Sequence, residues 1–254
     1  MMSKIFSVSK TTFYVTLRQN FCVLFLFFAM LFVAASYFLG RLSIQEMSRI
    51  VMNTSLLSAH IFSVLFAIFI GTSTLWQEED RFILHNALSK AIKRWEYFLG
   101  KYLGLLYVLF LMFFVFLVTD VVLFYFLNIS VHLSFCQAMG ALFFESALIL
   151  AIAMFFSTFT QPLVGIFATL AIYIVGSYVQ SLRLVPSLTS GKKAFLEVLY
   201  YLLPNFSRYD ISSLLSQTNS MPWGLLFFLL MYSFIFIVIT LLLSILVFNC
   251  RQLR

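Results

Sequence analysis

The sequence predicts an all-α polytopic membrane protein, and three observations lead to that fold class. Hydrophobic residues make up 63% of the 254 residues and charged residues only 10%, whereas soluble domains have about half apolar and about a quarter charged residues. Six segments are apolar over about the twenty residues that a helix needs to cross a bilayer. None of them alternates in polarity as the strands of a membrane β-barrel do. The length suits a single transmembrane domain over residues 1–254, without a separate soluble ATPase domain.

The six predicted spans cover residues 21–39, 55–75, 102–127, 135–157, 163–179 and 224–248. Each is expected to be a helix, because a segment that crosses lipid has to satisfy its own backbone hydrogen bonds. Residues 3–18, before the first span, mix apolar side chains with Lys4, Lys10 and Arg18 and are too broken to span. We expect a short helix in the inner membrane interface there, with a frayed leader as the alternative. Residues 192–203 are also too short to cross, and they suit a re-entrant or interfacial helix before the last span.

Basic residues set the expected orientation. The net charge is +7, from 16 Lys and Arg against 9 Asp and Glu. In a soluble protein this excess would suggest nucleic acid, but here it fits basic residues that flank spans and face anionic membrane lipid. Ten basic residues fall on one predicted face: Lys4, Lys10, Arg18, Arg81, Lys90, Lys93, Arg94, Lys101, Arg251 and Arg254. Six fall on the other face, so the positive-inside rule places both termini in the cytoplasm.

The predicted cytoplasmic loop between the second and third spans is the most highly charged segment. Glu78, Glu79 and Asp80 come first, and apolar residues then recur at intervals of three and four. This pattern predicts a short amphipathic helix across the cytoplasmic mouth of the protein. From physical reasoning alone, the helix either docks into a groove on a soluble partner or rests on lipid.

Three motifs carry a resemblance to a known family. Residues 80–104, DRFILHNALSKAIKRWEYFLGKYLG, resemble the first cytoplasmic loop of ABC-2 type transporter permeases, and more narrowly the branch named for multicopper-enzyme maturation. Ala91 stands where that family has a proline. Residues 155–162 with 173–179 resemble the family's fourth and fifth spans, and residues 203–210, LPNFSRYD, resemble its segment before the sixth span. The resemblance covers nearly the whole chain.

The resemblance implies a permease subunit of an ATP-driven exporter in the bacterial inner membrane. Two such permeases, identical or different, would pair with two cytoplasmic ABC ATPase subunits. The family's motif positions are occupied here by Leu88, Ser89, Lys90, Arg94, Gly100 and Lys101. The coupling helix of the loop would seat in a cleft of the ATPase, and the residues expected to couple to it are Arg81, Leu88, Ser89, Lys90, Lys93 and Arg94. The chain has no Walker A sequence, so ATP and Mg²⁺ would bind to the partner chain. No cofactor and no catalytic residue are expected on this chain.

Three polar residues within the spans are candidates for function. Glu145 lies in the middle of the fourth span, where a charge costs roughly 2.5–3.5 kcal/mol, so it should face the bundle interior. A substrate-path or gating role and a structural hydrogen bond are both open for it. Asp120 lies late in the third span, near the outer boundary, and is expected to contact water rather than to be buried. His60 is expected to be an interfacial polar group near the outer end of the second span.

Two other classes of protein remain as rivals. An intramembrane enzyme would need a carboxylate pair, a metal cluster or a nucleophile with its base at membrane depth, and the spans contain none of these motifs. The three cysteines are widely separated and lack metal-ligand spacing, so no metal site is expected. An ion-coupled carrier or channel without an ATPase is the main alternative. The apolar composition belongs to the lipid-facing surface and does not identify the transported substrate.

Overall fold

The computed structural model describes residues 2–19, 47–80, 93–130, 133–183, 200, 203–209 and 223–250, with six single positions between 27 and 38. Helices account for its regular structure throughout these ranges. The helices are α1 (Met2–Leu17), α3 (Met47–Asp80), α5 (Arg94–Phe126), α6 (Leu133–Ser157), α7 (Pro162–Arg183) and α10 (Trp223–Cys250), with a 3-10 turn, η1 (Phe206–Tyr209).

Five of these helices, α3, α5, α6, α7 and α10, are long and apolar enough to cross a membrane. The prediction of an all-α, multi-pass membrane protein is therefore confirmed for the part of the chain that the structure describes. The predicted second to sixth spans each coincide with one of these helices, and only the third extends beyond its helix, by one residue past Phe126. The first predicted span, at residues 21–39, lies outside the described residues apart from single positions.

Two of the helices begin well before the predicted spans. Helix α3 starts at Met47 rather than at residue 55, and α5 starts at Arg94 rather than at residue 102. The first turn of α5 is stabilised by Glu96, whose carboxylate accepts a hydrogen bond from the backbone N–H of Lys93 at 3.2 Å. Both helices therefore include polar residues that precede their apolar segments.

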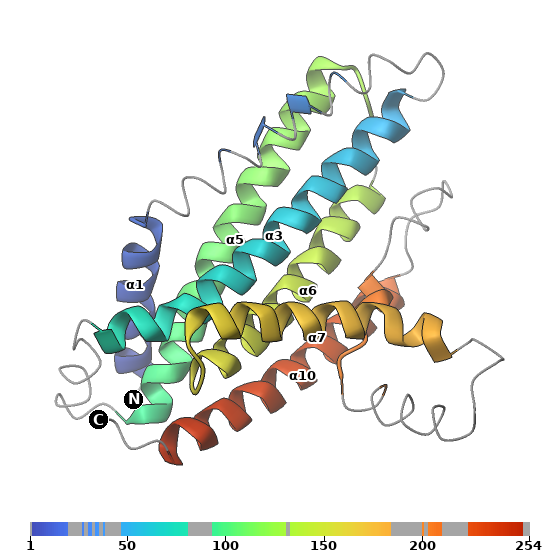
Figure 1. Ribbon diagram of the computed structural model, residues 1–254. Coiled ribbons are helices and arrows are strands. Elements are labelled where there is room, and N and C mark those ends of the chain that lie inside the picture. The colour runs from blue at the N-terminus through green and yellow to red at the C-terminus, as the bar shows by residue number, and fades with distance from the viewer. Residues whose placement is uncertain are drawn as a thin grey trace.

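The long helices α3, α5, α6 and α10 run along one another, while α1 and α7 lie across them (Figure 1). Helix α3 ends, and α5 begins, at the end of the bundle where α1 lies and α10 terminates, which we call the proximal end. Helices α3 and α6 begin, and α5 ends, at the opposite, distal end. Helix α6 is central. In its apolar 18-residue segment 72% of the residues are buried, whereas only 17% are buried in the corresponding segment of α10.

Small residues set how closely the helices approach one another. A Cβ atom on Gly71 of α3 would lie 2.5 Å from the Cβ of Ala153 on α6. A Cβ on Gly176 of α7 would lie 2.5 Å from the carbonyl oxygen of Pro204. Gly165 of α7 faces Thr72 of α3. These glycines serve packing within one chain, in the way that small residues do in membrane bundles.

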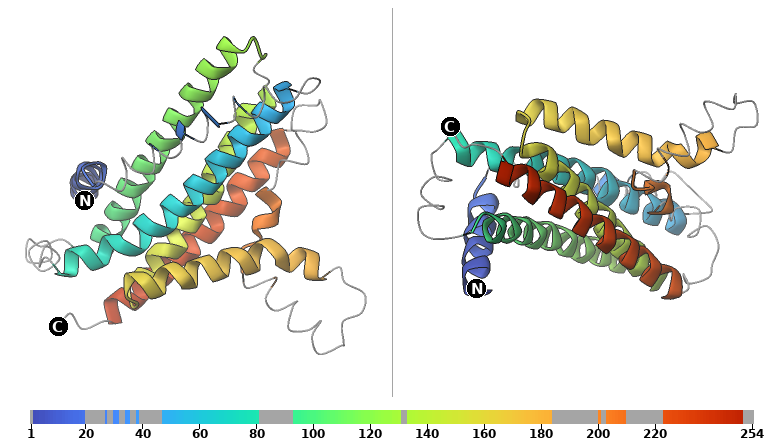
Figure 2. Two further views of the ribbon diagram at one scale, coloured as in Figure 1. Left: turned by 45° about the horizontal axis from the view of Figure 1, so that its top comes forward. Right: turned by 90° about the horizontal axis from the view of Figure 1, so that it is seen from below.

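Helix α1 confirms the helix expected before the first span, and the frayed-leader alternative is wrong. Two different views show α1 crossing α5 near the start of α5 (Figures 1 and 2). The crossing is tight, because a Cβ on Gly104 would lie 2.7 Å from the carbonyl oxygen of Ser9. Its predicted location in the membrane interface stays a prediction.

Candidate functional site

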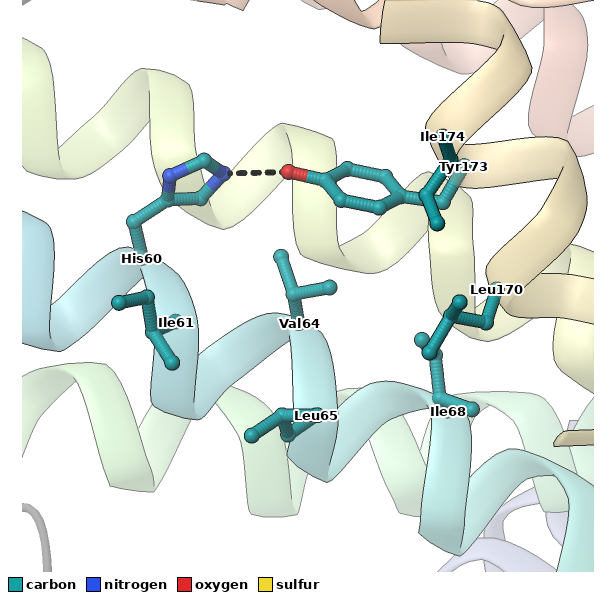
Figure 3. Close-up of a pocket in the computed structure, with 8 residues that line it drawn as sticks. All are labelled: His60, Ile61, Val64, Leu65, Ile68, Leu170, Tyr173 and Ile174. Carbon is teal, nitrogen blue, oxygen red and sulfur yellow. Dashed lines mark hydrogen bonds between the residues drawn. The ribbon is translucent and has the colours of Figure 1, made fainter. Parts of the chain in front are cut away.

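A polar cluster joins three of the membrane-spanning helices inside the bundle. His60 of α3 lies with its Nε2 atom 3.2 Å from Oε2 of Glu145 on α6. The same Nε2 atom lies 3.1 Å from the hydroxyl of Tyr173 on α7. Figure 3 shows the imidazole and the phenol meeting end to end across the gap between α3 and α7. One ring nitrogen is thus shared by an acid and a hydroxyl that come from two other helices.

The depth of the cluster follows from the lengths of the helices. His60 and Glu145 each lie about 18–20 Å along the helix axis from the start of α3 and α6, at a rise of about 1.5 Å per residue. We expected His60 near the outer end of its span; in the structure it lies well inside α3, because α3 begins at Met47 and not at residue 55, and its position relative to the membrane stays a prediction. One turn further along, the hydroxyl of Ser146 bonds the hydroxyl of Ser63 at 3.2 Å. The α3–α6 contact is therefore polar over two successive turns.

The burial of Glu145 agrees with the expectation that it faces the bundle interior. Its side chain is 3% exposed, whereas that of His60 is 31% exposed. A buried carboxylate is costly unless a partner donates hydrogen bonds to it. The imidazole of His60 lies 3.2 Å from this carboxylate and carries the opposite charge when it is protonated. The gating role of Glu145 stays a prediction.

The shared nitrogen links the proton positions of the three groups. If Nε2 carries a proton, it can donate to the Tyr173 oxygen, and an imidazole that is protonated on both nitrogens forms an ion pair with the Glu145 carboxylate. If Nε2 lacks a proton, it accepts a hydrogen bond from the Tyr173 hydroxyl. The cluster is thus a site where a proton can be held between side chains of different helices.

A cap formed by residues 203–209 lies against the cluster and α10. The hydroxyl of Tyr209 lies 2.6 Å from that of Ser233, and the backbone N–H of Asn205 donates to the Tyr232 hydroxyl at 2.7 Å. The guanidinium of Arg208 stacks 4.8 Å from the centre of the Tyr232 ring. Burial raises the pKa of the Tyr209 hydroxyl above its usual range, and the nearby Glu145 carboxylate raises it further. Tyr209 therefore stays a neutral hydrogen-bonding phenol.

A cleft of about 260 Å³ opens beside His60 and Tyr173 between α3 and α7. The other residues that line it are aliphatic: Ile61, Val64, Leu65, Ile68, Leu170 and Ile174 (Figure 3). The cleft therefore offers an apolar surface with one polar end.

Asp120 is buried, and the expectation that it contacts water was wrong. Its residue is 0% exposed, and Oδ1 accepts a hydrogen bond from the hydroxyl of Ser55 on α3. The error arose because the group that covers Asp120 belongs to another helix, α3, which contacts α5. Asp120 is separate from the Glu145 contacts and forms a second polar link between helices, and its role in gating stays a prediction.

Replacing Ser55 by alanine is expected to lower the free energy of unfolding by about 1–3 kcal/mol, because it removes the hydroxyl that bonds the buried Asp120. Thermal unfolding of the purified chain in detergent measures the change. Ser58→Ala is the matched control, since the Ser58 hydroxyl is also buried but bonds only the Ser55 carbonyl of its own helix. Equal midpoints for the two variants would contradict a stabilising Ser55–Asp120 contact.

The predicted coupling residues divide into two groups. Arg81, Leu88, Ser89 and Lys90 lie outside the described residues. Lys93 is exposed directly before α5. The guanidinium of Arg94 donates a hydrogen bond at 3.1 Å to the carbonyl oxygen of Phe248, in the last turns of α10, where a cation is favoured. Arg94 thus joins α5 to α10 at the proximal end, a contact that the sequence pattern did not indicate.

Lys101, one of the basic residues expected on the cytoplasmic face, is buried within the bundle instead. Its residue is 1% exposed, and its ammonium lies 5.3 Å from the centre of the Tyr97 ring. The predicted span boundaries did not indicate the burial of Lys101, because α5 already begins at Arg94 and Lys101 lies two turns inside the helix. In the described part of the chain, no group of three or more His, Cys, Asp and Glu side chains has the arrangement of a metal site.

No protein-family model matches the chain, and no curated protein sequence is significantly similar to it.

Proposed function

We propose that this chain is a membrane-spanning permease subunit of an ATP-driven exporter of the ABC-2 type, in the bacterial inner membrane and with both termini in the cytoplasm. It forms the translocation path with a second permease copy and couples to a separate cytoplasmic ATPase. One arrangement supports the proposal: the end of α3 and the start of α5 lie where α1 lies and α10 ends (Figure 1). The sequence of residues 80–104, which resembles a coupling loop, begins at the end of α3 and continues into the first turns of α5.

The long helices provide a mechanical path from this connection to the polar cluster. Helix α3 is continuous over 34 residues, from Asp80 at the proximal end back past His60. A displacement of the loop by an ATPase would act on α3 and α5 as rigid rods. Packed helices respond to such displacements by moving between alternative packings. The contact of His60 with Glu145 would then have to change, which gives Glu145 its proposed gating role.

The ion-coupled carrier remains the second candidate. One structural observation gives it more support than the sequence alone provided. Two carboxylates, those of Glu145 and Asp120, are buried within the bundle, and one of them contacts an imidazole. Buried acids and histidines of this kind form proton relays in membrane transporters. In that case the purified chain would move substrate in response to an ion gradient, without ATP.

Replacing Leu88 by aspartate is expected to reduce the amount of co-purified ATPase at least tenfold. A charge on the apolar face of the coupling helix would have to be buried in the ATPase groove. The measurement is purification of the tagged chain from native membranes, identification by mass spectrometry of a partner with a Walker A sequence, and its rate of ATP hydrolysis. Arg94 is kept unchanged, because its contact with Phe248 would confound the result.

Asn86→Asp is the matched control, since it adds the same charge two residues away, which is about 200° around the predicted helix from Leu88. We expect this variant to retain the ATPase. Retention of the ATPase and of ATP hydrolysis in Leu88→Asp would refute the coupling role. Gradient-driven transport by the purified chain alone would favour the carrier.

A further inference from the structure

A second cleft, of about 510 Å³, lies where α1 crosses α5. The residues that matter here are Phe6, Lys10 and Tyr14 of α1 and Tyr107, Phe110 and Leu111 of α5. We call it the α1–α5 cleft. It is distinct from the polar cluster, which is formed by α3, α6 and α7. The left view of Figure 2 shows α1 end-on beside α5, on the side of the bundle away from α10.

The cleft forms because two neighbouring faces of α1 lie toward α5. One face, with Val8 and Thr12, packs directly on two glycines of α5: a Cβ on Gly100 would lie 2.8 Å from Val8, and one on Gly104 would lie 2.7 Å from Thr12. Phe6, Lys10 and Tyr14 follow at intervals of four residues on a neighbouring face. The close crossing brings that face near α5 without letting its large side chains pack fully.

The aromatic walls of the cleft remain open. Phe6 is 65% exposed, Tyr14 is 61% exposed and Phe110 is 57% exposed. Exposed apolar surface of this kind marks a site of contact with lipid or protein. An apolar acyl chain can pack against these aromatic rings, and Tyr107 adds a hydroxyl to the same side of the cleft.

Charge distinguishes between the occupants. Among the described residues that line the cleft, Lys10 is the charged one, and its side chain is exposed. The sequence of α1 contains Lys4 and Lys10 and no acidic residue. A basic residue near an anionic membrane surface contributes attraction to lipid phosphates, while an apolar face beside it buries acyl carbon. The combination selects an anionic amphiphile over a neutral one.

We propose that the α1–α5 cleft binds one anionic phospholipid. The Lys10 ammonium contacts the phosphate, and one acyl chain lies along Tyr107, Phe110 and Leu111. The bound lipid fills the space that α1 leaves beside its glycine crossing and so fastens α1 to the bundle. This site does not depend on whether the chain works with an ATPase or as a carrier.

The test uses the full-length chain reconstituted in nanodiscs of dioleoylphosphatidylcholine and dioleoylphosphatidylglycerol, mildly delipidated and analysed by native mass spectrometry. The wild-type chain is expected to retain one phosphatidylglycerol in preference to phosphatidylcholine. Lys10→Gln is expected to reduce that retention about fivefold, the factor that follows from about 1 kcal/mol per basic residue near the surface. Phe110→Ala should reduce retention of the same lipid, because it removes apolar wall while Lys10 stays in place.

Lys4→Gln is the matched control, because it removes the same charge from the same helix but does not line the cleft. Its retention of phosphatidylglycerol is expected to equal that of the wild type. Equal losses in Lys4→Gln and Lys10→Gln would overturn the site in favour of general surface charge. Equal retention of both lipids by the wild type, or a dimer mass that Phe110→Ala abolishes, would also overturn it. Both Lys variants change exposed side chains, so an unchanged thermal midpoint confirms that each is folded.

Discussion

Gly71→Ala is expected to lower the free energy of unfolding by about 1–3 kcal/mol, although alanine is a better helix former than glycine. The added methyl would lie 2.5 Å from the Cβ of Ala153 and 3.3 Å from the carbonyl oxygen of Leu150. Both neighbours belong to α6, and Ala153 and Leu150 are almost fully buried. The contact involves backbone and a Cβ, which cannot rotate away, so α3 would have to move from α6. Gly71→Leu should prevent the native packing of these two helices.

Gly140→Ala is expected to stabilise the same bundle, in contrast to Gly71→Ala. Gly140 lies within α6, and a Cβ there meets no atom within 4 Å. We therefore expect an increase in stability of about 0.5–1 kcal/mol from the gain in helix propensity. Thermal unfolding midpoints of both variants in the same detergent measure the contrast. A Gly71→Ala variant as stable as Gly140→Ala would show that the α3–α6 contact is looser than described.

If the chain couples to an ATPase as proposed, Glu145→Gln is expected to raise the basal rate of ATP hydrolysis of that complex about fivefold. The substitution keeps the size of the side chain but replaces a charge-assisted contact with His60 by a neutral one, which is weaker by about 1 kcal/mol. If the contact holds the resting packing, its loss shifts the bundle toward the alternative packing by that factor. The measurement is ATP turnover in nanodiscs with the partner ATPase at saturating ATP.

A double-mutant cycle separates gating from simple packing. His60→Gln should produce a similar increase, and the double variant should exceed neither single variant, because the two residues act through one contact. Tyr173→Phe removes only the hydroxyl that bonds the same nitrogen, and a smaller effect is expected. Unchanged turnover in Glu145→Gln together with a lowered thermal midpoint would assign the pair a structural role. Additive effects of the two single substitutions would contradict the shared contact.

The membrane-spanning helices could be predicted from the sequence because insertion depends on local composition. The apolar segments at 135–157 and 224–248 differ from α6 and α10 by at most two residues at each end. The starts of α3 and α5 were predicted about eight residues too late. Polar residues such as Asn53 and Glu96 end an apolar segment but do not end a helix, since hydrogen bonds along the backbone continue through them.

The polar side chains show where prediction from the sequence reached its limit. Glu145 was expected inside the bundle, because its position in an apolar span makes exposure to lipid costly. The sequence contained a signal for its partner, since His60 lies in the neighbouring apolar segment, but two residues 85 positions apart do not reveal that they touch. Asp120 was misplaced for the same reason: the residue that covers it, Ser55, belongs to another helix.

The sequence by itself determined that the chain is a multi-pass helical membrane protein and which segments form five of its long helices, because the free energy of placing a span in lipid sums over adjacent residues. Only the tertiary structure decided which polar groups meet. It placed His60 between Glu145 and Tyr173, Asp120 under Ser55, and Arg94 on the end of α10. Those contacts depend on the rotation and register of whole helices, which close packing at residues such as Gly71 sets and which no local pattern encodes.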